Sequence, residues 1–260
     1  MKLTNLRWST YRIPFRAPFT TAHGMLTDRV AAVITAHTDT GYVGYGEIAP
    51  LPTHSGTSLD EALHALPGIA HELRGREVED ILHFLDGQCR ESQLPAALLC
   101  GLETALLDVS GQASGQSIAE LLARAYPCER ANDSAVTPRT RIPVNCVMSD
   151  EATEIMVAKA LQAVTAGFNC LKLKVTDASQ ATVERVKAIR AAIGPAPHLR
   201  LDANEGWDFE QARWMLRQCA ECDIQYVEQP LLGRDLAGMA RLRRVSPIPL
   251  AADEALSNPA

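Results

Sequence analysis

The sequence lacks the features that mark nucleic-acid-binding and membrane proteins. Basic residues are not in excess, since 25 Lys and Arg stand against 31 Asp and Glu, a formal net charge of −6. Without a basic excess or cluster, nucleic acid and anionic membranes would gain little from counterion release on binding. No apolar run approaches the roughly 20 residues that a bilayer-spanning helix needs. We therefore expect neither a nucleic acid nor a membrane as partner.

Paired cysteines and nucleotide-binding glycine motifs are also missing. The seven cysteines are odd in number and scattered through apolar stretches, so we expect reduced thiols in a cytoplasmic protein. The alternating start of the chain lacks the apolar core of a signal peptide, which agrees with that expectation. Cys219 and Cys222 have no second pair, and we interpret them as inert core thiols. No strand is followed by G-x-G-x-x-G or GxxxxGK[ST], which weakens a nucleotide-binding interpretation.

The sequence does contain enough apolar residues for a large core and two domains, with 47% hydrophobic residues among 260. In the first 50 residues the apolar positions recur at a spacing near two, which predicts strands over 3–15, 29–39 and the segment after the Thr40-Gly41 turn. From Ser58 the spacing becomes three to four, and Ser117 is a predicted N-cap. The pattern predicts an α+β domain over 1–125, with helices at 58–66, 78–88, 95–112 and 117–125.

A segment rich in proline and polar residues, 126–140, is the predicted linker. A strict alternation of strand and helix then fills 141–260. Short loops between successive units require parallel strands with helical crossovers. Either a doubly wound sheet or part of an eight-stranded (β/α) barrel fits this pattern, with strands predicted at 142–148, 170–175, 198–204, 224–230 and 248–256.

Three acidic residues occupy the C-terminal ends of three successive strands, one strand–helix unit apart: Asp202, Glu228 and Asp253. In a parallel barrel these positions lie side by side at the face that carries the chemistry. Three converging carboxylates repel one another unless a cation compensates, and an all-oxygen ligand set favours Mg²⁺ over Zn²⁺. The alternative is that each acid caps the helix after its strand, which explains one acid better than three.

Lys172 and Lys174 lie two residues apart on an otherwise apolar strand, so both side chains are expected on one face. The neighbouring acids would compensate their charge, and a lysine beside a divalent cation is expected to have a lowered pKa and to act as a base. The alternative is a pair of surface lysines at a strand edge. Together with a metal, these residues predict removal of an α-proton from a small carboxylate substrate through an enolate.

The motifs KLK, DAN, EQP and ADE resemble those of the enolase superfamily, muconate-lactonizing-enzyme subgroup, and the resemblance spans the whole chain. It implies an α+β capping domain followed by a modified TIM-type (β/α) barrel. It also implies Mg²⁺ as cofactor, with Asp202, Glu228 and Asp253 as ligands. Lys174 becomes the acid/base residue and Lys172 a neighbour of the substrate carboxylate. Lysine bases working with Mg²⁺ are a known pattern of this superfamily, so that pairing is no independent prediction.

The stretches GEIAPLPTHSGTSLDEAL, LLCGLETALLDVSGQ and IPVNCVMS resemble o-succinylbenzoate synthases, which implies a Mg-dependent dehydratase of menaquinone biosynthesis. A loop at about 19–24 would cover the substrate, with Thr21 and His23 as contacts, and Asn204 would be a polar neighbour of the site. Dipeptide epimerases, N-acylamino acid racemases and muconate cycloisomerases share the barrel motifs and form the alternative.

The resemblance has one departure. Family members carry a second catalytic lysine on the sixth barrel strand, whereas this sequence ends seven residues after Asp253. We therefore expect a fragment of a longer protein, with its barrel truncated after the fifth strand. A catalytically inactive fragment or a binding scaffold is the second alternative. The oligomeric state stays open, and a homo-oligomer is compatible with the sequence.

Overall fold

The computed structural model describes residues 1–21, 24–51, 58–91, 94–126, 138–149 and 152–256. The chain divides into two compact units, which are described separately. The first comprises Met1–Phe19 and Leu26–Thr140, and the second comprises Thr20–Met25 and Arg141–Ala260. Residues 127–137 of the predicted linker lie outside the described part. No helix among the described residues is long and apolar enough to cross a membrane.

The first unit contains a three-stranded sheet in the order β1-β2-β3, with β1 at Leu3–Thr21, β2 at Gly24–Thr38 and β3 at Val43–Ile48. β1 and β2 are longer than predicted, because β1 continues through Pro14 and Pro18. An edge strand tolerates proline, which cannot donate to a neighbouring strand. Most of the loop predicted at about 19–24 therefore belongs to strands. Ala22 and His23 lie outside the described residues, and the side chain of Thr21 is not described.

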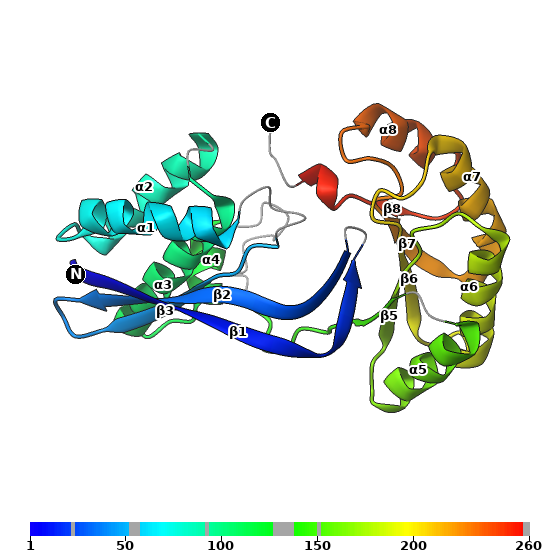
Figure 1. Ribbon diagram of the computed structural model, residues 1–260, viewed down its shortest axis with the longest axis horizontal. Coiled ribbons are helices and arrows are strands. Elements are labelled where there is room, and N and C mark those ends of the chain that lie inside the picture. Colours follow the sequence, from blue (N-terminus) through cyan, green and yellow to red (C-terminus); the bar gives the residue numbers. More distant parts are fainter. Residues whose placement is uncertain (22–23, 52–57, 92–93, 127–137, 150–151, 257–260) are drawn as a thin grey trace. The chain divides into compact units, whose positions relative to one another are not determined.

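Four helices complete the first unit (Figure 1): α1 at Leu59–Leu73, α2 at Val78–Glu91, α3 at Ala96–Ser114 and α4 at Ile118–Ala125. The predicted N-cap Ser117 is confirmed, since its side chain accepts from the backbone N–H of Glu120. α1 does not end at Leu66 as predicted but passes through Pro67. Leu66 and Leu73 are both fully buried, and their packing outweighs the hydrogen bond that proline removes.

The second unit is a five-stranded sheet in the order β4-β5-β6-β7-β8, with every neighbouring pair parallel. The predicted alternation of strand and helix is confirmed, although every strand is shorter than predicted, the first and last most of all. In Figure 1 the four α-helices lie on one face of the curved sheet. The strands are β4 at Cys146–Met148, β5 at Cys170–Lys174, β6 at His198–Asp202, β7 at Ile224–Glu228 and β8 at Leu250–Ala251. The helices are α5 at Thr153–Thr165, α6 at Gln180–Ile193, α7 at Phe209–Gln218 and α8 at Leu236–Val245, with short 3-10 turns at Ala220–Cys222 and Glu254–Leu256.

The core of the second unit includes alternate residues of β5 and β6. Leu171 and Leu173 of β5 are buried beside Leu199 and Leu201 of β6, which leaves the intervening residues for the opposite face of the sheet. Cys219 and Cys222 are buried in the same core. Burial, with the Cys222 thiol close by, raises the pKa of Cys219 to about 12, as expected of an inert core thiol.

Candidate active site

On the polar face of the second unit, the residues at the ends of three neighbouring strands lie side by side. Lys174 at the end of β5 pairs with Asp202 at the end of β6, which pairs with Glu228 at the end of β7. Glu228 in turn pairs with Ala251 at the end of β8. Asp202 and Glu228 therefore lie side by side, as their equivalent positions predicted. Asp253 lies two residues beyond the position that matches them.

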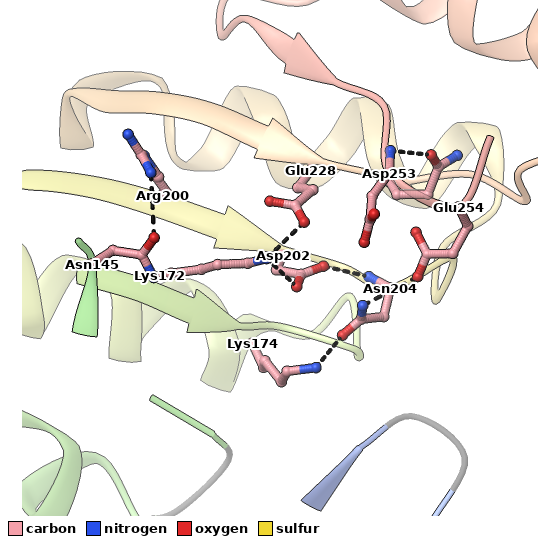
Figure 2. Close-up of polar contacts among 10 residues, drawn as sticks. Asn145, Lys172, Lys174, Arg200, Asp202, Asn204, Glu228, Asp253 and Glu254 are labelled. Atoms are coloured by element: carbon pink, nitrogen blue, oxygen red, sulfur yellow. Dashed lines mark hydrogen bonds and ion pairs between the residues drawn. The ribbon is translucent and has the colours of Figure 1, made fainter. Parts of the chain in front are cut away.

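Lys172 joins the two matched acids (Figure 2). Its Nζ lies 2.9 Å from Asp202 Oδ2 and 2.6 Å from Glu228 Oε1. The three side chains are largely shielded from solvent, with exposed fractions of 19% for Lys172, 2% for Asp202 and 13% for Glu228. Two carboxylates thus hold one cation in a poorly solvated site, where each charge depends on its partner.

The pKa of Lys172 is set by its burial and by the two acids beside it. Burial alone would lower it, but the hydrogen bonds to Glu228 and Asp202 and their negative charges outweigh burial and raise the pKa of Lys172. Burial also raises the pKa of Glu228, with contributions from Asp202 and Asp253 that the Lys172 ammonium opposes. The protonated lysine is therefore the counter-ion of this pair.

Lys174 occupies a separate position on the same strand. Its Nζ donates to Asn204 Oδ1 at 2.8 Å, and Asn204 Nδ2 donates to Glu254 Oε1 at 3.2 Å. The backbone N–H of Asn204 donates to Asp202 Oδ1 at 3.1 Å. Asn204 thus connects the lysine with one of the acids and with the segment after β8.

The local backbone explains how Asn204 reaches these partners. Asn204 and Glu205 both have positive φ, 42° and 63°, a region that asparagine enters more readily than most residues. Asn204 is buried, and the turn directs it across the ends of the strands. From the sequence, Asn204 was expected only as a polar neighbour of the site. Glu254 was not predicted to take part, although it directly follows Asp253.

Asp253 is placed by its backbone. Its N–H donates to Gln229 Oε1 at 2.9 Å, and its side chain is exposed. Within the described residues, no three Asp, Glu, His or Cys side chains lie close enough together to hold a metal ion as they stand. Asp253 is nevertheless near enough to Glu228 to raise its pKa.

The chemistry of these donors fits an oxygen-coordinated divalent cation. Asp202 and Glu228 already hold a cation, the ammonium of Lys172, between them. Asp253, which acts on Glu228 through its charge, is exposed to solvent. Carboxylate oxygens of this kind are the ligands of Mg²⁺, which retains water or substrate oxygens in its other positions.

A third polar cluster lies further down the same face, at Arg200. In register Arg200 lies beside Lys172 and Tyr226. Its Nε donates to Gln225 Oε1 at 2.6 Å and its guanidinium lies 4.9 Å from the centre of the Tyr226 ring. A second guanidinium nitrogen reaches Asn145 Oδ1 at 3.4 Å. These contacts engage the Arg200 guanidinium, and the cation that pairs with Asp202 and Glu228 is Lys172.

Two family models match the chain. One, described as the mandelate racemase / muconate lactonizing enzyme N-terminal domain, matches residues 5–123. The other, described as enolase C-terminal domain-like, matches residues 155–260. Between them they cover both units.

Among curated proteins, the L-Ala-D/L-Glu epimerase of Bacillus subtilis is 30% identical over 270 residues, which is 100% of this chain and 68% of the relative. The N-succinyl-L-Arg/Lys racemase of Bacillus cereus is 27% identical over 263 residues, 99% of this chain and 67% of the relative. The hydrophobic dipeptide epimerase of Enterococcus faecalis is 29% identical, over 92% of this chain but only 64% of the relative. The chain thus spans about two thirds of the length of these proteins.

Solved structures agree with the fold. A dipeptide epimerase from Enterococcus faecalis, in complex with Mg and the dipeptide L-Leu-L-Tyr, superposes with a TM-score of 0.86 at 27% identity. The match covers 98% of this chain and 68% of that one. A substrate-liganded L-Ala-D/L-Glu epimerase from Bacillus subtilis gives a TM-score of 0.82 at 28% identity, over 98% and 69% of the two chains. The predicted fold class, an α+β unit followed by a parallel β/α barrel-like unit, is confirmed.

Proposed function

Because this chain belongs to the mandelate racemase and muconate lactonizing enzyme family of the enolase superfamily, we propose that it takes part in Mg²⁺-dependent epimerisation or racemisation at the α-carbon of a dipeptide or N-acylamino acid. The relatives and structures described above are racemases and epimerases of such substrates. They favour this reaction over the o-succinylbenzoate synthase reaction that the resemblance of three sequence stretches implied.

The observation that carries the proposal is the separation of the two lysines. Lys172 is engaged by Asp202 and Glu228, whereas Lys174 is directed by Asn204 to a different point on the same face. In the proposed reaction Lys174 takes the α-proton on its Nζ. Asn204 accepts a hydrogen bond from that amine and holds it in one orientation, which favours the geometry needed for proton transfer.

Mg²⁺ would be held by Asp202, Glu228 and Asp253, where its charge would stabilise the negative charge that develops on the substrate carboxylate. Lys172, next to two of these acids, would place its ammonium near the same carboxylate. Both positive charges would then act beside the poorly solvated Asp202 and Glu228, where electrostatic stabilisation is stronger than in water.

The test is deuterium exchange at the substrate α-carbon. The purified chain would be incubated with Mg²⁺ in D₂O with L-Ala-L-Glu, L-Leu-L-Tyr or N-succinyl-L-Arg, and the α-proton signal followed by NMR. Loss of that signal with retained configuration requires one base, Lys174. Loss together with the opposite stereoisomer requires a second base on the other face of the carbon.

A parallel reaction with the cyclohexadiene carboxylate substrate of o-succinylbenzoate synthases distinguishes the proposed epimerisation or racemisation from the synthase reaction. An increase in aromatic product absorbance, with no α-deuterium exchange in any dipeptide or N-succinylamino acid, would contradict the proposal. It would instead support the o-succinylbenzoate synthase reaction. No turnover in any of these reactions, by a chain that is folded and binds Mg²⁺, would favour the second alternative, a catalytically inactive fragment or a binding scaffold.

A further inference from the structure

Gln229 is a buried polar side chain that none of the proposed chemistry uses. It follows the acid Glu228 directly and has no exposed surface. Its backbone has φ 34°, a left-handed conformation that is uncommon for a residue other than glycine. A fully buried amide in such a conformation persists only where surrounding contacts hold it.

The contacts of Gln229 reach three successive loops at the C-terminal ends of the strands. Its side-chain Oε1 accepts from the backbone N–H groups of Asp253 at 2.9 Å and Ala255 at 3.2 Å, in the loop after β8. Its Nε2 donates to the carbonyl of Leu231 at 2.8 Å, in its own loop. Its backbone carbonyl accepts from the N–H of Glu205 at 2.8 Å, in the loop after β6.

The backbone N–H of Gln229 adds a fifth bond, to the carbonyl of Ala251 at 3.0 Å. Parallel pairing between β7 and β8 is therefore extended past Glu228, and the side chain continues it where β8 ends. Glutamine suits the position because one oxygen can accept two N–H groups while the nitrogen donates. A buried network whose members are all satisfied is rigid and specific.

We propose that Gln229 is a positioning residue that sets the place of Asp253 relative to Asp202 and Glu228, and so the geometry of the third metal ligand. This inference rests on the proposed function, because it needs these acids to form a Mg²⁺ site. Asp253 itself is exposed, and its loop lies beyond the paired part of β8. The two N–H bonds to Oε1 supply the restraint that strand pairing does not.

The test compares Gln229→Met with Gln229→Glu. Methionine removes both polar groups, whereas glutamate keeps an acceptor oxygen for the N–H groups of Asp253 and Ala255. Gln180→Met is the control, since Gln180 is an exposed residue at the start of α6 and its side chain bonds Glu184 instead. Two quantities would be measured: hydrogen exchange of the Asp253 and Ala255 amides without metal, and the affinity for Mn²⁺ by electron paramagnetic resonance.

We expect Gln229→Met to accelerate exchange of both amides and to weaken Mn²⁺ binding by roughly 10- to 100-fold, the effect of removing a partner that orients a ligand. Gln229→Glu should keep the amides protected and retain Mn²⁺ affinity within about threefold, because the restraint on the loop survives. Gln180→Met should change neither quantity.

Unchanged exchange in Gln229→Met, or weakened binding in Gln229→Glu with its amides still protected, would overturn the positioning role. Failure of the unsubstituted protein to bind Mn²⁺ would instead overturn the proposed metal site. In that event the amide exchange still decides whether Gln229 holds the loop.

Discussion

The two units differ in how they use buried polar groups. Among the described residues of the first unit, Thr38 is the one buried polar side chain. The second unit buries Thr182, Asp202, Asn204 and Gln229, and the last three lie at or just beyond strand ends. Burying such groups is costly unless each is bonded. The first unit is therefore an apolar packing structure, whereas the second maintains a polar network at the edge where its chemistry is proposed.

The largest effect is expected from Lys174→Ala. Loss of the proposed base should reduce Mg²⁺-dependent α-proton exchange by about 10³-fold or more, within the range typical of general-base catalysis or above it. The circular dichroism spectrum should stay unchanged. Lys187→Ala, at an exposed position of α6, is the control. Retained exchange in Lys174→Ala would remove its proposed role.

Asp202→Asn tests the cost of breaking the polar network. The side chain is 2% exposed and is one of the two carboxylates that hold the Lys172 ammonium, so removing its charge should lower the free energy of unfolding by about 3 kcal/mol. The matched change in the first unit is Asp28→Asn. Asp28 pairs with Arg12, whose side chain is 65% exposed. That pair should contribute about 0–1 kcal/mol. Equal losses in urea denaturation would contradict the contrast between the units.

Gly46→Ala tests the apolar packing of the first unit. A Cβ at Gly46 would lie 1.9 Å from the carbonyl oxygen of Gly101 on α3, so strand and helix must move apart. We expect a loss of about 1–3 kcal/mol, as for overpacking of a core. Gly68→Ala, on α1 with open space around it, should be neutral or stabilising by up to about 1 kcal/mol. Calorimetry of both variants would decide, and a stable Gly46→Ala would show that the contact can relax.

Lys172→Met tests whether the ammonium and a metal ion compete for the same two carboxylates. Removing the ammonium leaves Asp202 and Glu228 uncompensated, so the metal-free protein should be less stable and Mn²⁺ should bind more tightly. A gain of roughly tenfold would correspond to about 1.4 kcal/mol. Isothermal titration calorimetry with Mn²⁺ measures this difference in affinity between the two proteins. Weaker binding would mean that Lys172 supports the metal site rather than occupying it.

The smallest effect concerns the thiols. Because the pKa of Cys219 in the folded protein is raised to about 12 from 9.0, the thiol contributes stability below pH 9 that is lost as the pH rises from 9 towards 12. Up to pH 9 Cys219 should resist alkylation by iodoacetamide, whereas the exposed Cys100 of the first unit should react. Mass mapping of the labelled peptides checks this. Labelling of both at one rate would place Cys219 outside the core.

Most of the fold was predictable because it depends on local periodicity. Spacings near two and near 3.6 marked the strands and helices, and short loops demanded parallel pairing. The ends of elements were less predictable. α1 extends past Pro67, and β1 passes two prolines, because burial and an edge position outweigh local preference.

The placement of Asp202 beside Glu228 was determined by the sequence alone, since parallel strands in register bring equivalent positions together. The division of labour between the lysines was not, because it depends on which carboxylate each ammonium reaches across the sheet. Nor was the role of Gln229, whose partners lie on two further loops. Sequence spacing defines which residues share a face, but only the tertiary structure decides how buried charges and amides satisfy one another.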